Sequence, residues 1–428
     1  MKRQFSKGFV FVLCYVAYVA IYAARLNLSM ASPAMIAGGV LTEVQYGFIG
    51  SAFFVTYACG RLLNGMIGDR TAPWIMISFG LLMTGIANLL IGTLPAYWLI
   101  LGLWCVNAYA QSMLWSSLLR CMTGLYGKQT ADKKVPILVS SVSVGNIAGI
   151  VLCTAMVDHF GIRAAFLVPG GLTVLLGLTT AWVLSTVPEG PKPAKQNFPV
   201  AEFIRDKQIR GMLLPALFHG VIKDNIGNWM AYYFVVRYAI DLESSALFVL
   251  LIPTVGMVGR LVYPLCYRLS GRRENRISVL CFIACALLAG VLCLNPGVPL
   301  VAAVCLSLIY ALVSMINTSI LSMFPLRFAE KNMVSSVSGL ADFATYLGAG
   351  IGSAVYGFWN KGGDFLPMFL SWVVLCGLSV GLLLIRLPQK KGAASCITKK
   401  SGRASCSAAW RRCFSKCLRG RSTGMAAC

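Results

Sequence analysis

The sequence has few charged residues and very few acidic ones. Only 12% of its 428 residues are charged, 14 of them acidic and 37 basic, while 58% of the chain is hydrophobic. A soluble domain carries about 25% charged residues. The composition therefore excludes an ordinary soluble domain and indicates a polytopic helical membrane protein. The basic excess does not indicate nucleic-acid binding, because much of it falls in loops on one side of the predicted membrane.

Histidines and the common catalytic motifs are also scarce. Two histidines, His159 and His219, leave little scope for a histidine metal site. The sequence lacks His-Glu-x-x-His, a Walker-type phosphate loop and Gly-x-Ser-x-Gly. Of the sixteen cysteines, eleven lie in apolar segments, where cysteine packs as a small hydrophobic residue. No nucleophile, base and orienting residue form a set, so we expect neither an enzyme nor a cofactor.

Long apolar segments dominate what remains. About 20 apolar residues span a bilayer core, and twelve such segments can be counted. We predict an all-α protein with twelve transmembrane helices at 9–36, 46–66, 74–93, 97–124, 134–157, 164–186, 209–238, 244–266, 276–293, 299–323, 332–358 and 365–386.

The loops divide the chain into four predicted parts. These are an N-terminal six-helix bundle (1–186), a proline-rich basic linker (187–208), a C-terminal six-helix bundle (209–388) and a tail (389–428) with ten Lys or Arg, five Cys and no acid. Lys and Arg gather at the N-terminus, in the linker and in alternate loops. Since cytoplasmic loops carry this excess, we expect an integral plasma-membrane protein with both termini in the cytoplasm. The tail is suited to anionic lipid or palmitoylation, and its cysteine spacing is a poor zinc pattern.

Arg25 lies deep in the first apolar segment. A charge at that depth costs at least roughly 3 kcal/mol on insertion scales, so it usually has a purpose. Tyr18, Tyr22 and Arg25 are spaced i, i+4, i+7 and share one helical face. We interpret this stripe as part of a polar track that faces inward. The alternatives are an arginine paired with an acid for packing, or one that extends to the membrane interface.

The chain also repeats itself. Gly60-Arg61-Leu62 recurs as Gly259-Arg260-Leu261 at an offset of 199, and the five residues at 139–143 recur at 334–338 at an offset of 195. An offset of 198 carries Arg25 onto Lys223, deep in the seventh segment. Parallel repeats of this kind place a site near the midplane between two pseudo-symmetric bundles. Arg25 and Lys223 would then converge from opposite halves and form an anion site, for a phosphate or a carboxylate.

These residues resemble the organophosphate:phosphate antiporter family of the major facilitator superfamily, over residues 8 to 388. The resemblance rests on Tyr18, Tyr22 and Arg25 in the first span, Tyr57 and Arg61 in the second, and Trp104, Asn107, Gln111 and Trp115 in the fourth. It continues with Lys223 and Trp229 in the seventh span and Tyr346 in the eleventh, while Gly65, Asp69 and Arg70 resemble the start of the superfamily's gating motif. The resemblance implies alternating access. It also implies that Arg25 and Lys223 grip a phosphoryl group, helped by Tyr18, Tyr22, Tyr57, Arg61, Trp115 and Tyr346.

The chain departs from the family pattern at several charged positions. Leu26 replaces a lysine, Gly145 stands where a histidine is often found, and Asp224 and Asp342 add acids. The site is thus predicted to be less positive than is usual in the family. Our hypothesis is that Asp342 or Asp224 neutralises Lys223 in the empty site and releases it when substrate binds.

We therefore expect a secondary active transporter of a small organic anion, foremost a phosphorylated metabolite exchanged for inorganic phosphate. A proton-coupled carboxylate symporter and a membrane sensor on a transporter fold remain alternatives. The expected partners are the lipid bilayer, the anionic substrate, and inorganic phosphate or a proton. We expect no nucleic acid, and a functional monomer would suffice.

Overall fold

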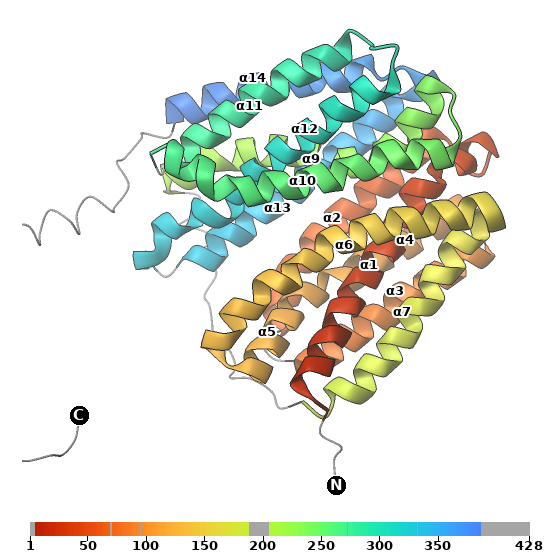
Figure 1. Ribbon diagram of the computed structural model, residues 1–428, viewed down its shortest axis with the longest axis vertical. Coiled ribbons are helices and arrows are strands. Elements are labelled where there is room, and N and C mark those ends of the chain that lie inside the picture. Colours follow the sequence, from red (N-terminus) through yellow and green to blue (C-terminus); the bar gives the residue numbers. More distant parts are fainter. Residues whose placement is uncertain are drawn as a thin grey trace, which may run out of the picture.

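The computed structural model describes residues 5–68, 71–94, 96–187, 205–271, 273–331 and 333–386. Within these ranges the chain is almost entirely helical. The helices, labelled as in Figure 1, are α1 (Lys7–Ala37), α2 (Glu43–Gly68), α3 (Pro73–Thr93), α4 (Tyr97–Ser112), α5 (Leu114–Tyr126), α6 (Lys128–Phe160), α7 (Ile162–Leu184), α9 (Lys207–Tyr238), α10 (Leu242–Leu269), α11 (Glu274–Cys293), α12 (Pro299–Thr318), α13 (Val334–Trp359) and α14 (Leu366–Arg386). Three short turns, η1 (Ser319–Met323), η2 (Pro325–Lys331) and η3 (Lys361–Gly363), complete the described elements.

Local sequence signals set the helix ends. The Ser6 hydroxyl accepts a hydrogen bond from the Phe9 amide and caps α1, and Asp241 does the same for the Ser244 amide at the start of α10. Proline opens α3 and α12, where its missing N–H group is no loss. Gly161 adopts a φ of 82° and separates α6 from α7. These signals explain why the helices end within a few residues of the predicted bounds.

The twelve predicted segments all correspond to helices. The largest difference in bounds is at α6, which was predicted to begin at 134 and begins at Lys128. The fourth segment contains two helices, α4 and α5, which meet at Met113, and the tenth continues from α12 into the π-helical turn η1. The predicted all-α class is confirmed.

Judged by length and composition, eight of the described helical stretches are long and apolar enough to cross a membrane. The helices α2, α9 and α13 are at least 26 residues long but fall outside that set. They carry the ionised side chains Arg61, Lys223, Asp224 and Asp342, which lower their mean hydropathy. Charged residues also occur within α1 and α10, at Arg25 and Arg260, but those helices are apolar enough to stay in the set.

The helices form two groups that follow the chain (Figure 1). The first six predicted spans, red to yellow-green, lie together, and the green to blue helices from α9 onward form the second group. Between the groups, α2 packs against α13, α6 against α10 and α1 against α9. The helices α1 and α9 are repeat counterparts, and the repeat relates the contact of α2 with α13 to that of α10 with α6. The predicted boundaries at 187–208 and 389–428 fall largely outside the described residues and stay predictions.

Hydrogen bonds join the two halves on one side of the membrane. We call the side on which α1 begins the N-terminal side and the other the opposite side. Towards the opposite side, the Ser29 hydroxyl donates to the carbonyls of Gly227 and Asn228 at 2.9 and 3.0 Å. Tyr46 donates to the Asn228 amide oxygen at 3.0 Å. The halves are therefore in close contact between the centre and the opposite side.

Two helices of the second half touch backbone to backbone. A Cβ atom added at Gly220 of α9 would overlap the Thr345 carbonyl of α13, and one added at Gly348 would overlap the Leu217 carbonyl. Small residues permit such approach between membrane helices. Glycine at these positions thus holds α9 and α13 together along one face.

Candidate functional site

Buried amides fix the turn of α1 that carries Arg25. Asn107 of α4 and Asn88 of α3 both donate to the Ala24 carbonyl, at 3.1 and 3.3 Å. Asn27 donates in turn to the Asn88 side-chain oxygen at 2.7 Å. Hydrogen bonds among buried polar groups are costly to break in an apolar setting. The backbone next to Arg25 is therefore held from two neighbouring helices.

The Arg25 side chain lies against two aromatic rings of α2. Its guanidinium carbon is 4.9 Å from the centre of the Phe53 ring and 5.0 Å from that of Tyr57. Such contacts stabilise a cation without neutralising it. Among the described residues, no carboxylate lies within ion-pair distance of Arg25. The guanidinium thus keeps its charge and its N–H groups for another partner.

Lys223 enters the same region from α9. Its ammonium group lies 3.3 Å from the carboxylate of the next residue, Asp224, and 5.5 Å from the centre of the Tyr346 ring. Both members of this ion pair are mostly buried, with 17% and 15% of their side-chain surface exposed. Adjacent residues on a helix do not ordinarily face each other. The pair therefore depends on both side chains turning towards the same space.

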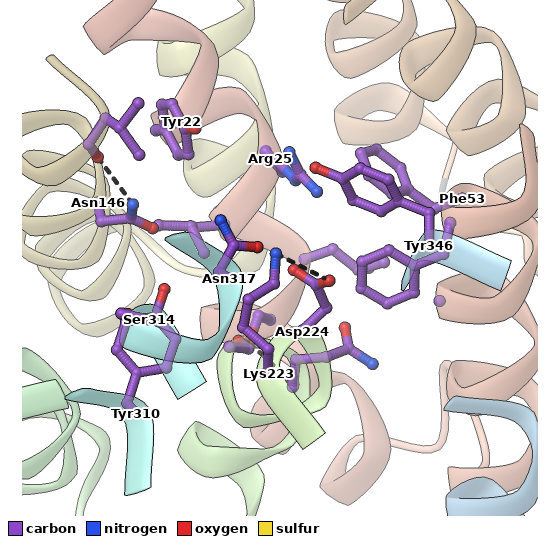
Figure 2. Close-up of a pocket in the computed structure, with 18 of the residues that line it drawn as sticks. Tyr22, Arg25, Phe53, Asn146, Lys223, Asp224, Tyr310, Ser314, Asn317 and Tyr346 are labelled. Carbon is purple, nitrogen blue, oxygen red and sulfur yellow. Dashed lines mark hydrogen bonds and ion pairs between the residues drawn. The ribbon is translucent and has the colours of Figure 1, made fainter. Parts of the chain in front are cut away.

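That space is a cavity of about 240 Å³ between the two halves. Helices α1, α2, α4 and α6 line it from one half, and α9, α10, α12 and α13 line it from the other. Figure 2 shows Arg25, Lys223 and Asn317 directed towards its centre. The volume lies just below the 300–1,000 Å³ that is usual for drug-sized ligands. The cavity suits a small polar anion.

The predicted site residues fall into two layers. Five of them line the cavity: Tyr22, Arg25, Lys223, Asp224 and Tyr346. Three support those residues from behind. Tyr57 packs on Tyr346 with ring centres 4.8 Å apart, and Tyr18 packs edge-to-face on Tyr22 at 5.7 Å and against Trp115 at 5.3 Å.

Arg61 and Asp342 form an ion pair of their own. The Arg61 Nη2 and Nε atoms donate to one Asp342 oxygen at 2.9 and 3.2 Å. The pair joins α2 to α13 and so connects the two halves. Asp342 is consequently the partner of Arg61 and not of Lys223, which has Asp224. Of the predicted gating motif, Gly65 lies in α2, and Asp69 and Arg70 lie outside the described residues.

Gly145 of α6 makes room for Tyr22. A Cβ atom at this position would lie 2.9 Å from the Tyr22 ring. A histidine here would therefore displace Tyr22 from the cavity wall.

Sequence reasoning missed several residues of the cavity wall. These are Asn146 of α6, Arg260 of α10, and Tyr310, Ser314 and Asn317 of α12. The signal for Arg260 was present, since it is the repeat counterpart of Arg61. In the described part of the chain, no three His, Cys, Asp or Glu side chains are placed to hold a metal ion.

Comparison with known proteins agrees with this architecture. The sequence pattern of the Major Facilitator Superfamily matches residues 14–353. The chain belongs to the Major Facilitator Superfamily. Solved structures show the same fold for this superfamily member: the nucleoside transporter NupG aligns with a TM-score of 0.71 over 88% of this chain and 97% of its own, at 12% identity. A D-xylose-proton symporter aligns with a TM-score of 0.72 over 90% of this chain and 99% of its own, at 11% identity.

Curated relatives of this superfamily member include proteins named for phosphorylated sugars. A "Probable hexose phosphate transport protein" of Chlamydia trachomatis is 24% identical over 269 residues, which cover 58% of this chain and 59% of that protein. The "Membrane sensor protein UhpC" of Salmonella typhimurium is 24% identical over 188 residues, 44% of this chain and 42% of its own. The bovine "Glucose-6-phosphate exchanger SLC37A2" is 32% identical over 150 residues, 33% of this chain and 30% of its own.

These matches confirm the predicted resemblance to the organophosphate antiporter family. The aligned regions span less than two thirds of the length of these relatives. The proteins they name are transporters, an exchanger and a membrane sensor, so the expectation of a non-enzyme is confirmed. Together with the apolar helices, they establish an integral membrane protein.

Proposed function

We propose that this protein is a secondary active transporter of a small organic phosphate, which it exchanges for inorganic phosphate. The observation that carries the proposal is the convergence of Arg25 and Lys223 on one cavity between the two halves. Arginine binds phosphoryl oxygens through two parallel N–H groups. The rings of Phe53 and Tyr57 contact the Arg25 guanidinium without neutralising its charge.

Lys223 supplies the second contact. Its ammonium group is paired with the Asp224 carboxylate at 3.3 Å. An entering phosphoryl group competes with Asp224 for the ammonium group and draws α9 towards α1. Because Arg25 and Lys223 belong to different halves, one anion can hold the halves together at the centre.

Alternating access would follow from this arrangement. The halves are joined towards the opposite side by Ser29, Tyr46 and Asn228, so we propose that the substrate enters this state from the N-terminal side. Breaking these few hydrogen bonds, and closing the halves on the N-terminal side, would expose the same cavity to the opposite side. The Lys and Arg distribution makes the N-terminal side cytoplasmic in this proposal, and the membrane the plasma membrane.

Purified protein in vesicles loaded with inorganic phosphate tests the proposal. We expect uptake of labelled phosphate in exchange for the internal pool, and inhibition by sugar phosphates. Arg25→Ala should lower exchange at least thirtyfold, because truncating one member of a buried charged contact costs about 2–5 kcal/mol. The matched control is Arg163→Ala, which removes an exposed arginine at the start of α7 and should leave exchange unchanged. Wild-type rates in Arg25→Ala would refute the assignment of the site.

A membrane sensor is the second candidate, and the similarity to UhpC favours it. A sensor binds its ligand with little turnover. Saturable thermal stabilisation by a phosphate ester without any exchange would support the sensor. Uptake of a carboxylate driven by an acid gradient, with no phosphate exchange, would instead identify a proton-coupled symporter.

A further inference from the structure

Arg260 is a third cation in the wall of the central cavity, beside Arg25 and Lys223. Its Nε atom is buried and has no hydrogen-bond partner. The ion pairs among the described residues are Arg61–Asp342, Lys223–Asp224 and Arg327–Glu274, and none of them includes Arg260. Arg260 as a whole is partly buried, and a partly buried cation that lines a cavity without a counter-ion is a candidate for binding an anion.

The internal repeat explains why Arg260 has no acidic partner. Arg260 corresponds to Arg61, and the contact of α10 with α6 corresponds to that of α2 with α13. Arg61 is paired with Asp342 of α13. The offset of 195 that relates the fifth and eleventh segments carries Asp342 onto Ile147 of α6, since 342 − 195 = 147. The two halves thus contain the same arginine, and only one half contains its carboxylate.

Close packing fixes Arg260 on the α12 side of the cavity. A Cβ atom at Gly256 would overlap the Tyr310 ring, and one at Gly259 would lie 2.5 Å from the Ala311 carbonyl. The turn of α10 that carries Arg260 therefore lies directly on α12. Figure 2 shows Tyr310 and Ser314 across the cavity from Phe53, whose ring contacts Arg25, and from Tyr346. Arg260 and Arg25 belong to different ends of one cavity.

Charge and polarity differ between the two ends. Arg25 is surrounded by aromatic rings, while the end formed by α12 offers the hydroxyls of Tyr310 and Ser314 and the amide of Asn317. The Asn317 side-chain oxygen is buried without a partner. The lining cations are Arg25, Lys223 and Arg260, against the single carboxylate of Asp224. A phosphoryl group that binds Arg25 and Lys223 still leaves Arg260 without a counter-ion.

We propose that Arg260 binds a second anionic group on the substrate, so that the preferred substrates are organic phosphates that also carry a carboxylate or a second phosphoryl group. This inference rests on the proposed phosphate site. It makes Arg260 a specificity-determining residue. Arg25 and Lys223 bind the phosphoryl group that all substrates share, and Arg260 favours those substrates that carry a second anionic group. The Tyr310 and Ser314 hydroxyls supply further donors to the same group.

Two matched pairs of probes test the inference. Glycerol 3-phosphate and 3-phosphoglycerate share a three-carbon skeleton, and glucose 6-phosphate and 6-phosphogluconate share a six-carbon one. In each pair the second compound adds a carboxylate. The measurements are inhibition of labelled phosphate exchange in vesicles and thermal stabilisation of the purified full-length protein. We expect the wild type to prefer the acid of at least one pair by tenfold or more, and Arg260→Gln to reduce that preference at least tenfold.

Two further variants complete the experiment. Arg237→Gln removes an arginine that binds Asn295 at the end of α9, away from the cavity, and should keep the wild-type preference. Arg260→Lys keeps the positive charge and replaces Arg260→Gln in the experiment if that variant does not fold. We expect Arg260→Lys to lose part of the preference for the acid. An unchanged preference in Arg260→Gln, or in Arg260→Lys where that variant has to serve, overturns the inference, as does a wild type that prefers the member without the carboxylate in both pairs.

The two readouts separate this inference from the proposed function. Exchange without any Arg260-dependent preference upholds the transporter and overturns the role of Arg260. Absence of exchange, with thermal stabilisation by the acids that Arg260→Gln diminishes, overturns transport and upholds Arg260 as a ligand-binding residue. Neither exchange nor stabilisation by any probe overturns both.

Discussion

The ion pair between Arg61 and Asp342 offers the sharpest test of how the halves are held. Two N–H groups donate to one carboxylate oxygen, and the side chains are 30% and 18% exposed. Unit charges about 4 Å apart attract by about 4 kcal/mol at an effective dielectric constant of about 20. Desolvation and partial exposure reduce this, so we expect a net coupling of about 1–3 kcal/mol.

A double-mutant cycle measures that coupling. Arg61→Gln and Asp342→Asn should each lower the unfolding temperature of the detergent-solubilised protein by a few degrees, since each leaves an unpaired, partly buried group. The double variant should lose less than the sum of the two. Additive losses would show that the pair contributes nothing, and the calculation above would be refuted.

The same pair should bias the access states. Ser29 is 4% exposed and joins the halves towards the opposite side, so a cysteine placed there reports opening of that side. A coupling of about 2 kcal/mol corresponds to roughly a thirtyfold change in an equilibrium. Arg61 lies near the end of α2 and Asp342 near the start of α13, so the pair joins the halves on the N-terminal side and should favour closure there, which accompanies opening of the opposite side. Adding Asp342→Asn to Ser29→Cys should therefore lower the rate of labelling by an impermeant maleimide, up to about thirtyfold. Both samples carry the same cysteine, so the native thiols contribute equally. An unchanged rate would mean that the pair persists in both states.

Two other substitutions follow from the contacts. Arg25→Lys keeps the charge but loses the paired N–H groups, so phosphate affinity measured by competition should fall about tenfold or more; equal affinity would argue against bidentate binding. Gly220→Ala would force apart α9 and α13, and overpacking of this kind typically costs about 1–3 kcal/mol, more where backbone is met. Its unfolding temperature should drop well below that of Gly290→Ala, a matched change in α11 where an added Cβ meets nothing within 4 Å; similar values would contradict the close packing.

The fold was largely predictable because the bilayer imposes one constraint on every span. A spanning helix must be long and apolar, and that signal extends over some twenty residues. Breaks within a span escaped prediction. The junction of α4 and α5 at Met113, and the π-helical turn that continues α12, change a few hydrogen bonds without changing hydropathy.

The site residues could be predicted where a charged residue lies within an otherwise apolar segment. Arg25 and Lys223 stand out as charges within apolar segments, and the repeat paired them. Partners distant in sequence were not predictable. Asp342 is 281 residues from Arg61, and nothing in the sequence tells whether it serves Arg61 or Lys223. Arg260 was overlooked for the same reason, because its importance lies in an acid that the other half lacks at Ile147 of α6.

The glycine contacts between α9 and α13 give these two helices a mechanical role. Because Gly220 and Gly348 bring the two backbones into contact, we expect these helices to move together as one rigid unit. Lys223 lies on one helix of this unit, and Asp342 on the other. Substrate binding at Lys223 would then be coupled to the ion pair that joins Asp342 to α2.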